Sequence, residues 1–124
     1  KSVRAMHADG LYEIALCRHR KPVASAGHAL LVCRSGRLFG ADARGRIYKG
    51  RLRLYAKHAV RKGFLDAIYE TPPRVKPRRG TTVDMQSSVS VTGEIDPMAR
   101  SQLTKLLVGR KTVAVKITYI GPLP

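Results

Sequence analysis

Four histidines and two cysteines are the side chains in this sequence best suited to holding a metal ion. They are His7, Cys17, His19, His28, Cys33 and His58. A zinc site needs several such ligands around one ion, often spaced as Cys-x2-Cys or His-x3-His. Neither spacing occurs, so no metal or other cofactor is expected. We interpret His28, in an apolar run, as a hydrogen-bonded core residue, and the two cysteines as free buried thiols rather than a disulfide.

Candidates for catalysis are equally sparse. The chain has no G-x-S-x-G nucleophile motif, and its eight acidic residues are scattered. Glu13 and Asp42 are the acids near apolar segments, and nothing in the spacing brings them together. Gly36, Gly40 and Gly45 separate strand-like runs without the Gly-Lys-Ser/Thr of a phosphate loop. The sequence therefore predicts a protein that is not an enzyme.

Positive charge is the strongest chemical feature of the chain. Its 124 residues include 24 Lys or Arg against 8 Asp or Glu, which gives a net charge of +16. Such a field attracts polyanions, so an acidic protein surface or nucleic acid is the expected partner. The alternative is that these are solvated faces of an arginine-rich protein. The residues predicted to hold the partner are Lys49, Arg51, Arg53, Arg74, Lys76, Arg78 and Arg79.

The elements that must position these cations are mostly strands. With 44% hydrophobic residues the chain can form a core, and its length predicts one domain over residues 1–124. No apolar run is long enough to cross a bilayer. Alternation of apolar and polar residues, or a short apolar run bounded by turn residues, predicts strands over 11–17, 26–34, 37–40, 46–55, 82–92 and 112–120.

The clearest strand covers residues 46–55. Its apolar face carries Tyr48, Gly50, Leu52 and Leu54, and the opposite face carries Lys49, Arg51 and Arg53. One face therefore belongs to the core and the other is a basic stripe.

Two segments read as helical. Helical spacing of apolar residues favours a helix over 56–69, although Gly63 interrupts it and a strand from Gly63 to Glu70 is the alternative. A short helix near residues 97–108 is predicted from Asp96 as N-cap, Pro97 at the first helical position and leucines on one side. Three prolines and four cations predict an exposed loop over 71–81.

Strands joined by tight turns, with one helix, predict a small antiparallel barrel or a strongly curled sheet. A barrel interior could carry a small apolar ligand. The residues predicted to line such a pocket are Tyr12, Ile14, Leu30, Tyr48, Leu52 and Val115. The alternative is a core filled by side chains, as narrow barrels usually are.

Several motifs in the first half occur in the order found in one family. They are Asp9-Gly10-Leu11-Tyr12, the run from Gly27 to Val32 (GHALLV), the run from Arg34 to Asp42 (RSGRLFGAD) and Tyr48-Lys49-Gly50-Arg51. Together they resemble the GrlR family, small bacterial proteins named after a negative regulator of type III secretion genes. The resemblance covers about residues 9–54.

This resemblance implies a lipocalin-like β-barrel of six to eight strands, a cytoplasmic location and a homodimer. It also implies transcription regulation by binding a transcriptional activator, without catalysis. The chain departs from the family in having Gly40-Ala41-Asp42 where two glycines usually precede the Asp, and in lacking the acidic stretch associated with activator binding. We therefore expect a regulatory or adaptor protein whose basic surface selects an acidic partner. A nucleic-acid-binding module and a carrier of a small apolar ligand are the alternatives.

Overall fold

A computed structural model describes residues 9–18, 21–22, 28–71 and 88–124. Within these residues the chain forms strands and turns, and no helix. The strands are β1 (Gly10–Arg18), β2 (Lys21–Pro22), β3 (His28–Arg34), β4 (Arg37–Asp42), β5 (Ile47–Lys57), β6 (Val60–Glu70), β7 (Ser88–Ile95), β8 (Ser101–Val108) and β9 (Lys111–Gly121).

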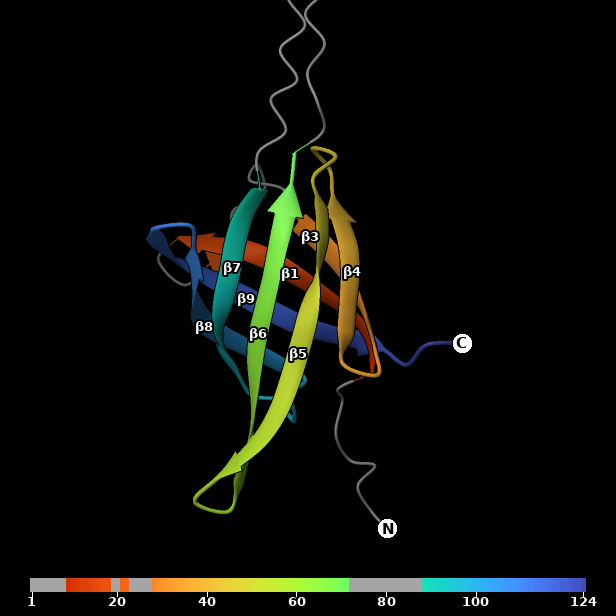
Figure 1. Cartoon of the computed structure of the whole chain (residues 1–124), viewed down its shortest axis with the longest axis vertical. Helices are drawn as coiled ribbons and strands as arrows, with labels where there is room; N and C mark the ends of the chain where they lie inside the picture. The colour runs from red at the N-terminus through yellow and green to blue at the C-terminus, as the bar shows by residue number, and fades with distance from the viewer. Residues whose placement is uncertain (1–8, 19–20, 23–27, 72–87) are drawn as a thin grey trace, which may run out of the picture.

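The strands form a closed antiparallel barrel. Sequence neighbours from β3 to β9 pair in order, β1 pairs with β3, and β1 also pairs with β9 to complete the ring. The short β2 pairs with the end of β1 and lies outside this ring. The long β5–β6 hairpin extends past the barrel at the bottom of Figure 1. The small barrel predicted from the sequence is thus confirmed, with eight strands in its wall.

Alternation along each strand separates a core from an outer surface. Inward positions form one cluster that runs through the barrel, and Tyr12 of β1 stacks edge-on against Tyr119 of β9 where the ring closes. The most deeply buried large side chains are Leu106 and Cys33. In β5, Tyr48 and Leu52 face inward and Lys49, Arg51 and Arg53 face outward, as predicted.

Close strand packing explains Gly50. A Cβ atom at this position would overlap the carbonyl oxygen of Asp66 and the Cα of Ala67 on β6. The two strands therefore approach each other as the small barrel requires, and only glycine fits between them.

Two of the described hairpins turn through two consecutive residues with positive φ. Ser35 and Gly36 join β3 to β4, at φ 52° and 81°, as the sequence predicted. His58 and Ala59 join β5 to β6, at φ 53° and 64°. Two consecutive left-handed residues match the right-handed twist of the flanking strands.

The helix predicted near residues 97–108 is wrong. Residues Ser101–Val108 form β8, which pairs along its whole length with β9. The capping chemistry is nevertheless present, because the carboxylate of Asp96 accepts a hydrogen bond from the backbone N–H of Met98. This contact closes a turn, and backbone pairing with β9 then overrides the helical spacing of the leucines.

The helix favoured over 56–69 is also wrong, and the alternative strand is correct. β6 pairs with β5 from Val60 to Glu70 and with β7 along most of that length. Leu65 and Ala67 face the core, whereas Phe64 and Ile68 face outward. The predicted exposed loop over 71–81 lies outside the described residues except for Thr71, as does the 82–87 part of the predicted strand 82–92.

Candidate binding sites

The basic stripe on β5 is partly neutralised by the neighbouring strand. Lys49 Nζ lies 3.7 Å from Glu70 Oε1, and Arg53 Nη2 lies 3.9 Å from Asp66 Oδ2. Both pairs are long and exposed, so each contributes little to stability. They do, however, reduce the positive field over these two cations, which leaves Arg51 as the stripe residue without a carboxylate at ion-pair distance among the described residues.

Arg51 belongs instead to a row of arginines that crosses three strands. Arg34 of β3 pairs with Arg37 of β4, and Arg37 pairs with Arg51 of β5. Paired residues point to the same face of a sheet, and all three side chains are on the outer surface. No carboxylate among the described residues lies within ion-pair distance of these three, which we call the arginine row. Strand spacing places them within about 10 Å of one another.

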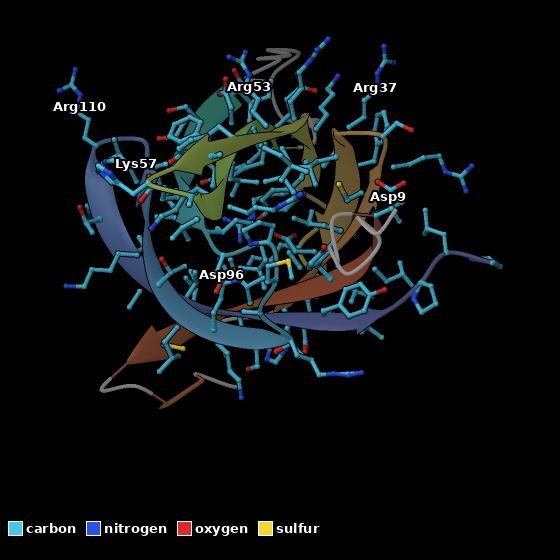
Figure 2. All side chains as sticks on the ribbon, turned by 90° about the horizontal axis from the view of Figure 1, so that it is seen from below. Asp9, Arg37, Arg53, Lys57, Asp96 and Arg110 are labelled. Atoms are coloured by element: carbon cyan, nitrogen blue, oxygen red, sulfur yellow. The ribbon has the colours of Figure 1, made fainter. Side chains whose placement is uncertain are left out.

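Sequence reasoning missed Arg34 and Arg37 although the signal was present. A two-residue turn at Ser35-Gly36 places the flanking residues directly opposite each other. Figure 2 shows Arg37 and Arg53 pointing away from the barrel, and Arg110 on another side of the molecule in that view. The predicted loop cations Arg74, Lys76, Arg78 and Arg79 lie outside the described residues.

Exposed apolar side chains lie on the same outer face, beside the arginine row. Leu30 of β3 and Phe39 of β4 are 54% and 53% exposed. Ile47 and Ile68, on β5 and β6, are also exposed. We call these four residues the apolar patch. Phe39 and Ile68 both lie opposite Lys49, so the apolar patch and the cations interleave on one surface.

The barrel interior holds a cavity of about 220 Å³. The space is partly open to solvent, because its lining includes the exposed side chains of Leu16 and His28. Its wall is mainly apolar and includes Ile14, Leu31, Leu65, Val91, Leu106 and Val115. A second, much smaller space of about 20 Å³ is lined in part by Tyr12, Ile14 and Leu52.

Most of the predicted lining residues face these two spaces. Tyr48 and Val115 line the larger, Tyr12 and Leu52 the smaller, and Ile14 lines both. The prediction was wrong for Leu30. On β3 the inward positions are Ala29, Leu31 and Cys33, so Leu30 points outward into the apolar patch. The run from Ala29 to Cys33 is apolar on both faces, so the sequence does not show which of its residues face the barrel interior.

A polar network forms one wall of the larger cavity. The Asp42 side chain is only 5% exposed, and its carboxylate accepts four hydrogen bonds. Oδ1 accepts from the backbone N–H groups of Arg44 and Arg46, while Oδ2 accepts from Arg46 Nε at 2.7 Å and Tyr48 Oη at 2.8 Å. The Arg46 guanidinium also lies 4.9 Å from the ring centroid of Tyr69.

These contacts fix the charge states of the network. Burial by itself would raise the pKa of Asp42, but the hydrogen bonds from Tyr48, Arg46 and Arg44 outweigh it and lower the pKa below its ordinary value. Burial would likewise lower the pKa of Arg46, and the contact with Asp42 reverses this and raises it. The pKa of Tyr48 is raised, first by burial and then by its hydrogen bond to Asp42. The network therefore holds a carboxylate, a guanidinium and a neutral phenol.

The histidine and cysteine side chains that the structure describes do not form a metal-binding cluster. His28 Nδ1 contacts Glu13 Oε2 on the outer surface, so His28 is hydrogen-bonded as predicted but is not a core residue. Cys33 is fully buried and Cys17 half-buried, and both are free thiols. No group of three or more metal-ligating side chains occurs within the described ranges. His7 and His19 lie outside them.

In the part of the chain that the structure describes, no helix has the length and apolar character that a membrane crossing requires. Comparisons with known proteins add no relative: no family model matches the chain, and neither the curated proteins nor the solved structures contain a significant match. The two candidate sites, the outer face of β3–β6 and the cavity, therefore stand on their own geometry.

Proposed function

We propose that this protein is a non-enzymatic regulatory or adaptor protein that binds an acidic protein partner through the outer face of β3–β6. The single observation that carries this proposal is the arginine row, Arg34, Arg37 and Arg51. Like charges directly opposite each other on a sheet are destabilising. Asp66 lies opposite Arg51 on β6, and Asp9 accepts a hydrogen bond from the Ser35 N–H between Arg34 and Arg37, so nearby carboxylates offset part of the repulsion among the three arginines. An acidic partner would relieve the rest.

The apolar patch favours a protein partner over nucleic acid. Protein interfaces combine apolar and aromatic contacts with arginine, and Phe39 and Leu30 supply the apolar part beside the row. A nucleic-acid backbone would use the cations but leave the apolar side chains without a partner. The face therefore suits an acidic segment that also carries apolar anchors.

The resemblance to the GrlR family supports the biological setting of the proposal. It points to a cytoplasmic homodimer that controls transcription, in the manner of a negative regulator of type III secretion, by occupying a regulatory protein. Here the partner's surface would be acidic, because the face that binds it is basic. Sedimentation equilibrium tests the dimer directly.

A matched pair of variants tests the binding face. Arg37→Glu/Arg51→Glu reverses two members of the arginine row, and Lys105→Glu/Arg110→Glu makes the same change in net charge on exposed residues of β8 and its following turn. The probe is a fluorescein-labelled peptide that alternates Glu with Phe and Leu, measured by polarisation in moderate salt. We expect the first variant to bind at least about tenfold more weakly and the second to bind nearly as the native protein does.

Two further probes separate the alternatives. A peptide in which Phe and Leu are replaced by Ser should bind more weakly than the Glu/Phe/Leu peptide, and a short DNA duplex should bind more weakly still at the same salt concentration. Equal losses in the two charge variants would show that net charge, rather than the arginine row, controls binding. Tighter binding of the duplex would favour the nucleic-acid alternative and overturn the proposal.

A further inference from the structure

The interior cavity has the volume and the wall of a ligand site rather than a packing defect. Its volume of about 220 Å³ compares with the roughly 150 Å³ of an apolar cavity that binds benzene. Benzene has six non-hydrogen atoms, so in proportion to its volume this cavity would hold a molecule of about nine non-hydrogen atoms. It falls below the ~300–1,000 Å³ of sites for drug-sized ligands, so a long-chain lipid would not fit within it.

The polar wall determines which head group the cavity accepts. Asp42 already accepts four hydrogen bonds, which occupies the roughly four acceptor sites of a carboxylate. It therefore has no capacity left for a ligand cation or donor. Arg46 contributes only Nε to the bond with Asp42, so the outer edge of its guanidinium remains the group through which it could bind a ligand acceptor.

Arg46 is also held in place before any ligand arrives. Its Nε is bonded to Asp42, its backbone N–H donates to the same carboxylate, and its guanidinium lies over the Tyr69 ring. Tyr48 packs against Tyr69 with ring centroids 5.3 Å apart, which supports that platform. A pre-positioned guanidinium loses little conformational freedom on binding, and its fork geometry matches a carboxylate.

We propose that the cavity binds a small monocarboxylate with an apolar tail, such as a short fatty acid or an aromatic acid, with the carboxylate on Arg46 and the tail among Leu65, Val91, Leu106 and Val115. The four hydrogen bonds that Asp42 accepts, two of them from Arg46, spread its negative charge and reduce its repulsion of the ligand carboxylate. The net charge of the whole chain also favours an anion. This site is separate from the outer face of β3–β6.

The direct test compares an acid with its neutral isostere in the full-length chain. Heptanoate and heptanamide are titrated by calorimetry, and binding is located by chemical-shift changes of the methyl groups of Val91, Leu106 and Val115. We expect saturable binding of heptanoate that shifts these methyl groups, and at least about tenfold weaker binding of heptanamide. Equal affinities would overturn the carboxylate assignment, and no shift at the methyl groups would overturn the cavity as the site.

Two variants assign the tail and the head group. Ala67→Leu fills the cavity from a buried inward position on β6, so it should abolish the binding of both ligands. Heptanoate binding that survives Ala67→Leu would show attachment to the basic exterior and would refute the proposal. Arg46→Gln alone would leave Asp42 as an uncompensated buried charge and risks unfolding the barrel.

The double variant Asp42→Asn/Arg46→Gln avoids that risk because it removes both charges together. It should bind heptanamide about as well as the native protein does and lose the preference for heptanoate. A preserved preference for heptanoate in a folded double variant would contradict the role of Arg46. The single variant Lys57→Glu, at the exposed end of β5, serves as the control and should leave heptanoate binding unchanged.

Discussion

Leucine truncations along β8 provide the sharpest test of the fold, because strand and helix give opposite expectations. Leu103, Leu106 and Leu107 would share one side of a helix, which is why the sequence suggested one. In the strand, Leu106 faces the core at 1% exposure, whereas Leu103 and Leu107 face outward at 53% and 46%. Leu→Ala at each position therefore removes very different amounts of buried surface.

The expected losses follow from burial. Leu→Ala at fully buried sites costs ~2.7–5 kcal/mol, including the cavity that remains. Leu106 already borders the 220 Å³ cavity and so has fewer neighbours to lose, which places Leu106→Ala near the lower end, at about 3 kcal/mol. For a domain of this size that lowers Tm by ~12 °C. Leu103→Ala and Leu107→Ala should each cost less than ~1 kcal/mol.

Urea unfolding followed by far-ultraviolet circular dichroism is the suitable assay, since the chain has no Trp. A second substitution, at Gly93, tests the position of Leu106 more specifically. A Cβ at Gly93 on β7 would lie 2.6 Å from Leu106 Cδ2 and 3.2 Å from the carbonyl oxygen of Lys105. Leu106→Ala removes only the first contact, so Gly93→Ala should destabilise the native protein more than the Leu106→Ala variant. The coupling free energy should be about 1–2 kcal/mol. Losses at Leu103 or Leu107 as large as that at Leu106 would refute the inward–outward assignment of β8.

Three further outcomes are expected. Gly50→Ala should reduce the free energy of unfolding by about 2–3 kcal/mol, because the added Cβ overlaps the backbone of β6; an unchanged urea midpoint would contradict this close approach. Burial above all, and then the charge of Asp9, raises the pKa of the Cys33 thiol to about 11, so Ellman's reagent should modify Cys17 well before Cys33 in the native protein, and equal rates would argue against this. Because its hydrogen bonds lower the pKa of Asp42, the stability that it contributes is present above the unfolded-state pKa of ~3.9 and is lost as pH falls through the lower folded value. Asp42→Asn should therefore flatten the acid side of a plot of Tm against pH, and an unaltered slope would show that Asp42 does not contribute.

Strands in which apolar and polar residues alternate strictly could be predicted from the sequence. Segments such as 46–55 and 112–120 place apolar residues at every second position, and both are strands. The predicted core face is confirmed for Tyr48 and Leu52, whereas Leu54 is 42% exposed, where the β5–β6 hairpin extends past the barrel.

The Ser35-Gly36 hairpin could be predicted because glycine adopts the positive φ of a tight turn at little cost. The His58-Ala59 hairpin was not, since neither residue is a turn former, and without that turn the segment 56–69 resembled a helix.

The candidate sites could be predicted only in part from the sequence, because they depend on which strands become neighbours. The basic face of β5 follows from its own alternation, but the carboxylates of Asp66 and Glu70 reach it through pairing with β6. The same holds for the cavity. Asp42, at the end of β4, bonds residues two to six positions along the chain, but its place in the cavity wall depends on how the strands close into a barrel.

Pairing between β1 and β9 determines when a newly made chain can fold. Tyr12 and its partner Tyr119 are 107 residues apart in the chain, so β1 is synthesised long before the strand that pairs with it. Until β9 emerges, both β1 and β8 present open edges that could pair with another molecule. Folding thus depends on contacts between distant parts of the chain, which slows it and exposes the nascent protein to aggregation. Closing the ring thus makes its first strand wait for its last.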